Sequence, residues 1–166
     1  MREHLHPELR GSKYFVFIDD SGCYTDCSDE VSTFIGYNRS ELLHLKIEDL
    51  SFDKSRVPPL FERYKREGSQ NGEFILRHKN GTPLLIRYDA WIFEDGCHAA
   101  AWEPAEEWEQ LFFSALIETD PILLRDKINI ALATIQKRQS TIDVMESPDI
   151  RQKLSDASEA LRTLLL

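Results

Sequence analysis

Three aspartates near the start of the chain, Asp19, Asp20 and Asp26, are the residues whose type and spacing could bind a divalent cation. Calcium loops of the helix-loop-helix type space their oxygen ligands regularly and close the site with a glutamate. This segment has neither that spacing nor that glutamate. A solvated turn explains the carboxylates better, because Asp19 and Asp20 run directly into Ser21-Gly22. No metal site is therefore predicted.

Residue patterns typical of enzymes are absent from the sequence. There is no glycine-rich phosphate loop, no nucleophile elbow and no His-Glu-x-x-His zinc motif. His4 and His6 lie beside Pro7, where isolated histidines are typically solvated rather than bound to metal. We therefore expect no catalytic residues and no enzyme activity.

The composition restricts the partners that the protein can have. Its 166 residues include 20 lysines and arginines against 29 aspartates and glutamates, a formal net charge of −9. This acidity disfavours nucleic acid and anionic membranes, since both require a positive protein surface.

The cysteines indicate a reducing compartment. The chain has three, Cys23, Cys27 and Cys97, an odd number without a Cys-x-x-Cys pair, which does not suit a disulfide framework. A cytoplasmic location is therefore expected. No apolar run reaches the roughly 20 residues that cross a membrane, and no signal peptide is recognised at the N-terminus.

Short apolar and alternating segments predict five strands. The turn Asn80-Gly81 is the strongest short-range signal for a hairpin. Residues 19–22 and 94–96 supply the other turn signals, because in each an aspartate is followed within two residues by glycine. The predicted strands are 14–18, 23–27, 72–79, 82–93 and 97–102.

Between the second and third predicted strands the pattern changes to short helices. The stretch Phe34-Ile-Gly-Tyr-Asn-Arg-Ser-Glu-Leu-Leu43 predicts two helical turns joined at Gly36, because glycine tolerates the backbone conformation in which a chain leaves a helix. Pro58-Pro59 can occupy the first turn of a further helix over 60–67, whose apolar residues share one face.

The corner Gly-Tyr-x-x-x-Glu-Leu-Leu at 36–43, within the order strand, strand, short helices and three strands, resembles the PAS domains. These are small sensor modules of signalling proteins, bacterial ones among them. The resemblance covers residues 13–103, after a lead-in over 1–12. It implies an α+β fold, a five-stranded antiparallel sheet with short helices on one face.

Residues 104–166 predict an all-helical C-terminal extension. Asp120-Pro121 and Ser147-Pro148 are helix start signals, in which a capping residue precedes proline. Three amphipathic stripes, beginning at Trp108, Leu124 and Ile150, favour a helical hairpin or a small bundle. The stripes pack on one another and on the sheet, or one of them pairs with a second subunit.

In PAS domains a ligand pocket lies between the sheet and the helices. The resemblance and the strand alternation assign eight residues to such a pocket, and the same residues are alternatively the packed core of a domain without a ligand. The eight are Phe17, Phe34, Tyr64, Phe74, Leu76, Tyr88, Ile92 and Ala100. A predicted interface with a second copy or a protein partner consists of Trp91, Trp102, Trp108, Leu111 and Phe112.

Two cofactors of the family are disfavoured by the residues present. Light-sensing flavin members carry a reactive cysteine in an Asn-Cys-Arg-Phe-Leu-type motif, whereas 37–43 of this chain contains no cysteine. Haem members place a ligating histidine on the long helix, and none lies within 53–70. His44, His78 and His98 are not expected to ligate haem either, so no particular cofactor is predicted beyond a small apolar ligand.

The expected function is that of a sensory and signalling module. It would bind a small ligand or a protein partner and relay the change through helix packing or dimerisation. The main alternative is a ligand-free structural adaptor or dimerisation module. Many family members end in an Asp-x-Thr motif, which Trp102-Glu-Pro-Ala-Glu106 replaces here, and the tail has neither a histidine nor a Gly-Gly-Asp-Glu-Phe cyclase signature. We therefore expect an output by binding rather than by ordinary coupling to a kinase or cyclase.

Overall fold

The computed structural model describes residues 7–142 and 148–165. The chain forms two compact units, Met1–Pro104 and Ala105–Leu166, which are described separately. All the described strands belong to the first unit, and the described part of the second unit is helical. Among the helices so described, none is both long enough and apolar enough to cross a membrane.

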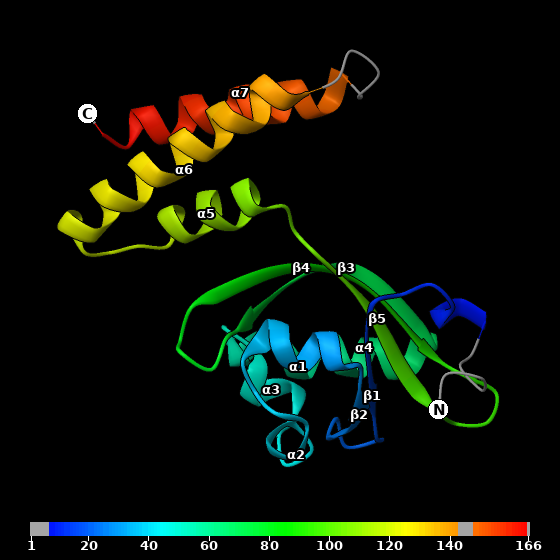
Figure 1. Cartoon of the computed structure of the whole chain (residues 1–166). Helices are drawn as coiled ribbons and strands as arrows, with labels where there is room; N and C mark the ends of the chain where they lie inside the picture. The colour runs from blue at the N-terminus through cyan, green and yellow to red at the C-terminus, as the bar shows by residue number, and fades with distance from the viewer. Residues whose placement is uncertain (1–6, 143–147, 166) are drawn as a thin grey trace. The chain divides into compact units, whose positions relative to one another are not determined.

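The first unit is built on a five-stranded antiparallel sheet, which confirms the predicted fold class (Figure 1). The strand order is β2-β1-β5-β4-β3, so the first and last strands of the unit pair with each other near the centre of the sheet. The strands are β1 Tyr14–Ile18, β2 Tyr24–Cys27, β3 Ser69–Arg77, β4 Pro83–Ile92 and β5 His98–Pro104.

Short helices connect β2 to β3 and cover one face of the sheet (Figure 1). The longest of them, α4, carries Pro58 and Pro59 in its first turn, where a proline removes no helical hydrogen bond. A single 3₁₀ turn, η1 Pro7–Leu9, precedes β1. The connecting helices are α1 Asp29–Ile35, α2 Arg39–Leu42, α3 Ile47–Leu50, η2 Lys54–Arg56 and α4 Val57–Glu67.

Alternation along the strands determines which side chains meet the helices, because successive side chains point to opposite faces of a sheet. In β1, Val16 is buried in the core, and Tyr14 and Ile18 pack around it. In β4, Ile86 is buried, and Leu84 and Tyr88 pack beside it. The even-numbered residues of both strands therefore form the inner face.

The corner between α1 and α2 is held by backbone capping. Gly36 ends α1 in the left-handed conformation, with φ 76°, and its N–H donates to the carbonyl of Ser32. Asn38 caps α2 by accepting from the N–H of Glu41, and the Glu41 carboxylate accepts from the N–H of Asn38 in return. Lys79 attaches the β3–β4 hairpin to this corner through an ion pair with Glu41, 2.7 Å from Nζ to Oε1.

The second unit has its own hydrophobic core. It consists of α5 Glu107–Leu116, α6 Pro121–Thr141 and α7 Pro148–Thr163. Ile128 and Ile135 of α6 are fully buried with Leu154 and Leu161 of α7. Asp120 begins α6 by accepting hydrogen bonds from the N–H groups of the first turn, as its place before proline predicts.

Replacing Gly36 with alanine is expected to destabilise the first unit for two reasons. The left-handed conformation costs a non-glycine residue about 1–2 kcal/mol, and an added Cβ would lie 2.6 Å from Cε1 of His78. Gly96→Ala is the matched control, because Gly96 has φ 79° and no atom within 4 Å of the added Cβ. We expect the Gly36 variant to lose more free energy of unfolding in urea denaturation. Equal losses would contradict a steric contribution from His78.

The ion pair between Glu118 and Lys127 is expected to make the helical unit sensitive to acid. The Lys127 ammonium donates to the Glu118 carboxylate at 2.6 Å, and with the N–H of Asp120 it lowers the pKa of Glu118 to about 2. A lowered pKa stabilises the fold above the unfolded value of about 4.3, and this stabilisation is lost as the pH falls toward 2.

Glu118→Gln should therefore lower the melting temperature at pH 7 and make little difference at pH 2, measured by circular dichroism. Glu159→Gln is the control, because Glu159 makes no ion pair in the described residues of the tail. An equal loss at both pH values for Glu118→Gln would contradict the ionic origin of the effect.

Candidate functional site

A row of small side chains crosses the middle of the inner sheet face. Ala100 of β5 pairs with Ala90 of β4 and, on its other side, with Val16 of β1. Larger residues flank the two alanines, since the next inner pair along the strands is Tyr88 with Trp102. Two alanines between bulky neighbours leave space that helix side chains must fill.

The helix side chains do not completely fill the space beside Ala90 and Ala100. An apolar cavity of about 100 Å³ remains between the sheet and α4. Leu60, Phe61 and Tyr64 of α4 line one side, and Ile47 of α3 and Val57 at the start of α4 line another. Empty cavities persist in proteins when their walls are apolar, and cavities of this order bind small apolar molecules. The geometry therefore suits a small neutral ligand.

Of the eight residues that the sequence assigned to a pocket, the structure brings five together around this cavity. Four come from the sheet and one from α4, and all face the space beside the alanine pair. They are Tyr64, Phe74, Leu76, Tyr88 and Ala100. Whether these residues bind a ligand stays a prediction.

Phe17, Phe34 and Ile92 do not line the cavity. Phe17 alternates with the inner residues of β1, so its ring lies on the outer face, 5.9 Å from that of Phe15. Phe34 packs edge-on against Tyr14, with ring centroids 5.7 Å apart, at the α1 side of the core. Ile92 lies beyond the cavity at the last inner position of β4.

The residues assigned to an interface are separated by the fold. Trp91 lies on the outer sheet face, stacked on Phe93 at 6.4 Å. The prediction that Trp102 lies at an interface is wrong. Its side chain is on the inner face of β5, with the other even-numbered residues, where it is buried and lines the cavity. The other three belong to the core of the helical unit, with Trp108 buried and Leu111 and Phe112 half-buried against it. The side chains of these three residues therefore pack mainly within the helical unit itself.

Several residues that line the cavity were not assigned to a pocket from the sequence. Among them are Ile47, Leu60, Phe61 and Gln70. The helix face that carries Tyr64 already contained the signal for Leu60 and Phe61, since all three lie within one turn. Gln70 could not be found in this way, because β3 begins earlier than its apolar residues indicate.

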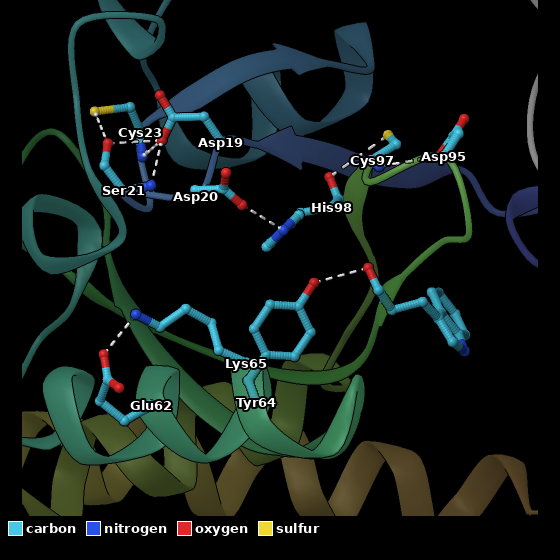
Figure 2. A network of polar contacts seen from close by, with 11 residues as sticks. Asp19, Asp20, Ser21, Cys23, Glu62, Tyr64, Lys65, Asp95, Cys97 and His98 are labelled. Atoms are coloured by element: carbon cyan, nitrogen blue, oxygen red, sulfur yellow. Dashed lines mark hydrogen bonds and ion pairs between the residues drawn. The ribbon is translucent and has the colours of Figure 1, made fainter.

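Tyr64, which lines the cavity, also contacts a group of polar side chains that includes His98 and Asp20 (Figure 2). Tyr64 Oη donates a hydrogen bond of 2.7 Å to the carbonyl of Trp91. The His98 ring meets the Tyr64 ring edge-on at 5.6 Å, and its Nε2 lies 3.0 Å from Oδ1 of Asp20. Burial raises the pKa of Tyr64, and the neighbouring Cys97 adds to the shift, so the phenol stays protonated as a donor.

The three aspartates considered as a cation site are engaged in separate interactions. Asp19 accepts from Ser21 and Cys23 within its turn, which lowers its pKa. Asp20 contacts His98, and Asp26 pairs with Arg39 at 2.6 Å. In the part of the chain that the structure describes, no group of three histidine, cysteine or acidic side chains is close enough to hold a metal.

A family model described as "PAS domain" matches residues 12–99, more than half of the chain. No curated protein sequence matches this chain.

Solved structures with the same fold include a domain of a sensory box sensor histidine kinase/response regulator from Geobacter sulfurreducens. It is 24% identical, with a TM-score of 0.51 over 56% of this chain and 84% of that one. A PAS domain from a two-component sensor histidine kinase is 15% identical, with a TM-score of 0.51 over 55% and 84%. A PAS domain of a protein from Colwellia psychrerythraea is 17% identical, with a TM-score of 0.50 over 55% and 85%. At these identities the likeness establishes the fold alone.

Tyr64→Phe tests the polar group beside the cavity. Removing the hydroxyl deletes its bond to Trp91, which should cost about 1 kcal/mol at neutral pH. A raised pKa also means that the unfolded chain loses its proton first, so stability should fall above about pH 10 and less steeply in the variant. Tyr88→Phe is the control for the hydrogen bond at neutral pH, because no hydrogen bond of its hydroxyl is seen within the described residues, whereas burial raises the pKa of Tyr88 as well. Equal costs in chemical denaturation would contradict this role of Tyr64.

Proposed function

Since the chain belongs to the PAS domain family, we propose that it is a sensory signalling module whose sheet cavity binds a small apolar molecule. The observation that carries this proposal is the cavity of about 100 Å³ beside Ala90 and Ala100. A packed adaptor needs no such space, because voids in a core cost contacts on every wall. The net charge of −9 supports a small molecule or a protein as partner rather than nucleic acid or an anionic membrane.

The relay would act through a change in helix packing or in dimerisation. A ligand changes such an equilibrium only if it binds one arrangement more tightly than the other. Two elements that line the cavity could change position between the two arrangements and so change the affinity for the ligand. They are α4, through Leu60 and Phe61, and β5, through Ala100 and Trp102. The three free cysteines accord with a cytoplasmic setting.

A second candidate is an adaptor that binds a protein partner or a second copy through the outer sheet face. The aromatic pairs Phe15–Phe17 and Trp91–Phe93 favour it, since aromatic side chains are enriched at protein interfaces. Native mass spectrometry of protein purified without added ligand separates the two candidates. A releasable small molecule supports the sensor, and a dimer without extra mass supports the adaptor.

Filling the cavity should abolish binding without unfolding the domain. Ala100→Leu places a larger side chain beside Ala90, so the affinity for benzene, followed by nuclear magnetic resonance titration, should fall at least about tenfold. Ala101→Leu is the matched control, because its side chain points to the opposite face of the same strand and does not line the cavity. If benzene leaves the spectrum of the unmodified protein unchanged, or binds equally well to the Ala100 variant, the proposed ligand site is wrong.

A further inference from the structure

A second cavity, of about 130 Å³, adjoins the first on the side of the β1–β2 turn. Its wall differs in chemistry from that of the inner cavity, because polar side chains from three segments reach it. Ser21 comes from the turn, Lys46 and Glu48 from the start of α3, and Glu62 from α4. We call it the outer cavity.

The linings of the two cavities overlap. Ile47, Val57 and Phe61 line both of them. At Gly22, the position where a Cβ would stand is 3.5 Å from Cδ1 of Ile47 and 3.6 Å from Cζ of Phe61. The tips of these two side chains therefore lie against the glycine of the turn, where the two linings overlap.

The outer cavity is lined by charged side chains of both signs. Glu62 pairs with Lys65 at 2.6 Å, an ion pair drawn in Figure 2. Lys46 and Glu48 are exposed and make no ion pair with the described residues. The lining therefore presents charges of both signs beside the hydroxyl of Ser21, a mixed polar surface that can hydrogen-bond an uncharged hydroxyl group.

We propose that the two cavities form one site for a small amphiphile, with its apolar part beside Ala100 and an uncharged hydroxyl end in the outer cavity. This inference rests on the proposed function, since the inner cavity must first bind an apolar group. It extends that function by naming the ligand class and by assigning Phe61 as the residue that sets how far a ligand reaches.

Phe61 suits this role because its ring is half-buried and contacted from two sides. Lys65 Nζ lies 5.1 Å from the centroid of the Phe61 ring, and the Tyr64 ring lies 5.9 Å away. A ligand chain that passes between Gly22 and α4 replaces contacts of the ring with contacts of its own. A smaller side chain at position 61 joins the cavities permanently.

Benzene and 2-phenylethanol distinguish the two proposals, because they share a ring and differ by a short chain with a hydroxyl. In amide nuclear magnetic resonance spectra, both should shift the signals of Leu76 and Ala100, which line the inner cavity. Only 2-phenylethanol should also shift the signals of Ser21, Gly22 and Glu62, which line the outer cavity.

Phe61→Leu should raise the affinity for 2-phenylethanol relative to benzene by about tenfold, since methylene groups that enter an apolar passage contribute at this level. Phe52→Leu is the matched control, because Phe52 is exposed and lines neither cavity. It should leave the ratio of the two affinities unchanged.

Three outcomes decide the inference. Shifts at Ser21 and Gly22 with 2-phenylethanol alone, together with the altered affinity ratio in the Phe61 variant, support it. Binding of both probes with shifts confined to the inner cavity and an unchanged ratio overturns it and leaves the proposed function standing. Absence of any binding by benzene overturns the proposed function, and the two-cavity site with it.

Discussion

The site depends on one constraint, the pairing of two alanines at the centre of a sheet. Because β5 lies between β1 and β4, the space above Ala100 and Ala90 is surrounded on all sides by larger inner residues. The helices leave this space partly open, with Leu60, Phe61 and Tyr64 of α4 along it. The small size of this pair therefore accounts for the space that remains against α4.

The fold could be predicted because several independent local signals agreed. Asn80-Gly81 fixed one hairpin, Gly36 fixed the helix corner, and the prolines marked three helix starts. Each of these features acts through the backbone within a few residues, so it can be read without knowing the partners in space. The packing surfaces of the tail could not be read in this way, because an amphipathic stripe indicates burial but not its partner.

The site was harder to predict than the fold for a related reason. Residues 14–18 are apolar on both faces of the strand, so their pattern does not indicate which alternate residues point toward the core. Phe17 was therefore assigned to the wrong face. Trp102 was also assigned to the wrong face, because the three alanines that precede it in β5 do not distinguish the inner face from the outer one. The inner set of β4 was identified, since its outer face contains the charged residues Arg87 and Asp89. Alternation is informative only where one face is polar.

The path of the chain connects the cavity to the helical unit through β5. Trp102 lines the cavity, the strand ends at Pro104, and α5 begins at Glu107. A shift of the whole strand would break hydrogen bonds to both β1 and β4, which makes it costly. Pro104 has no N–H to donate, so the pairing with Ile86 is weakest at that end. The sheet therefore holds β5 least firmly at Pro104, the residue from which the chain continues toward α5.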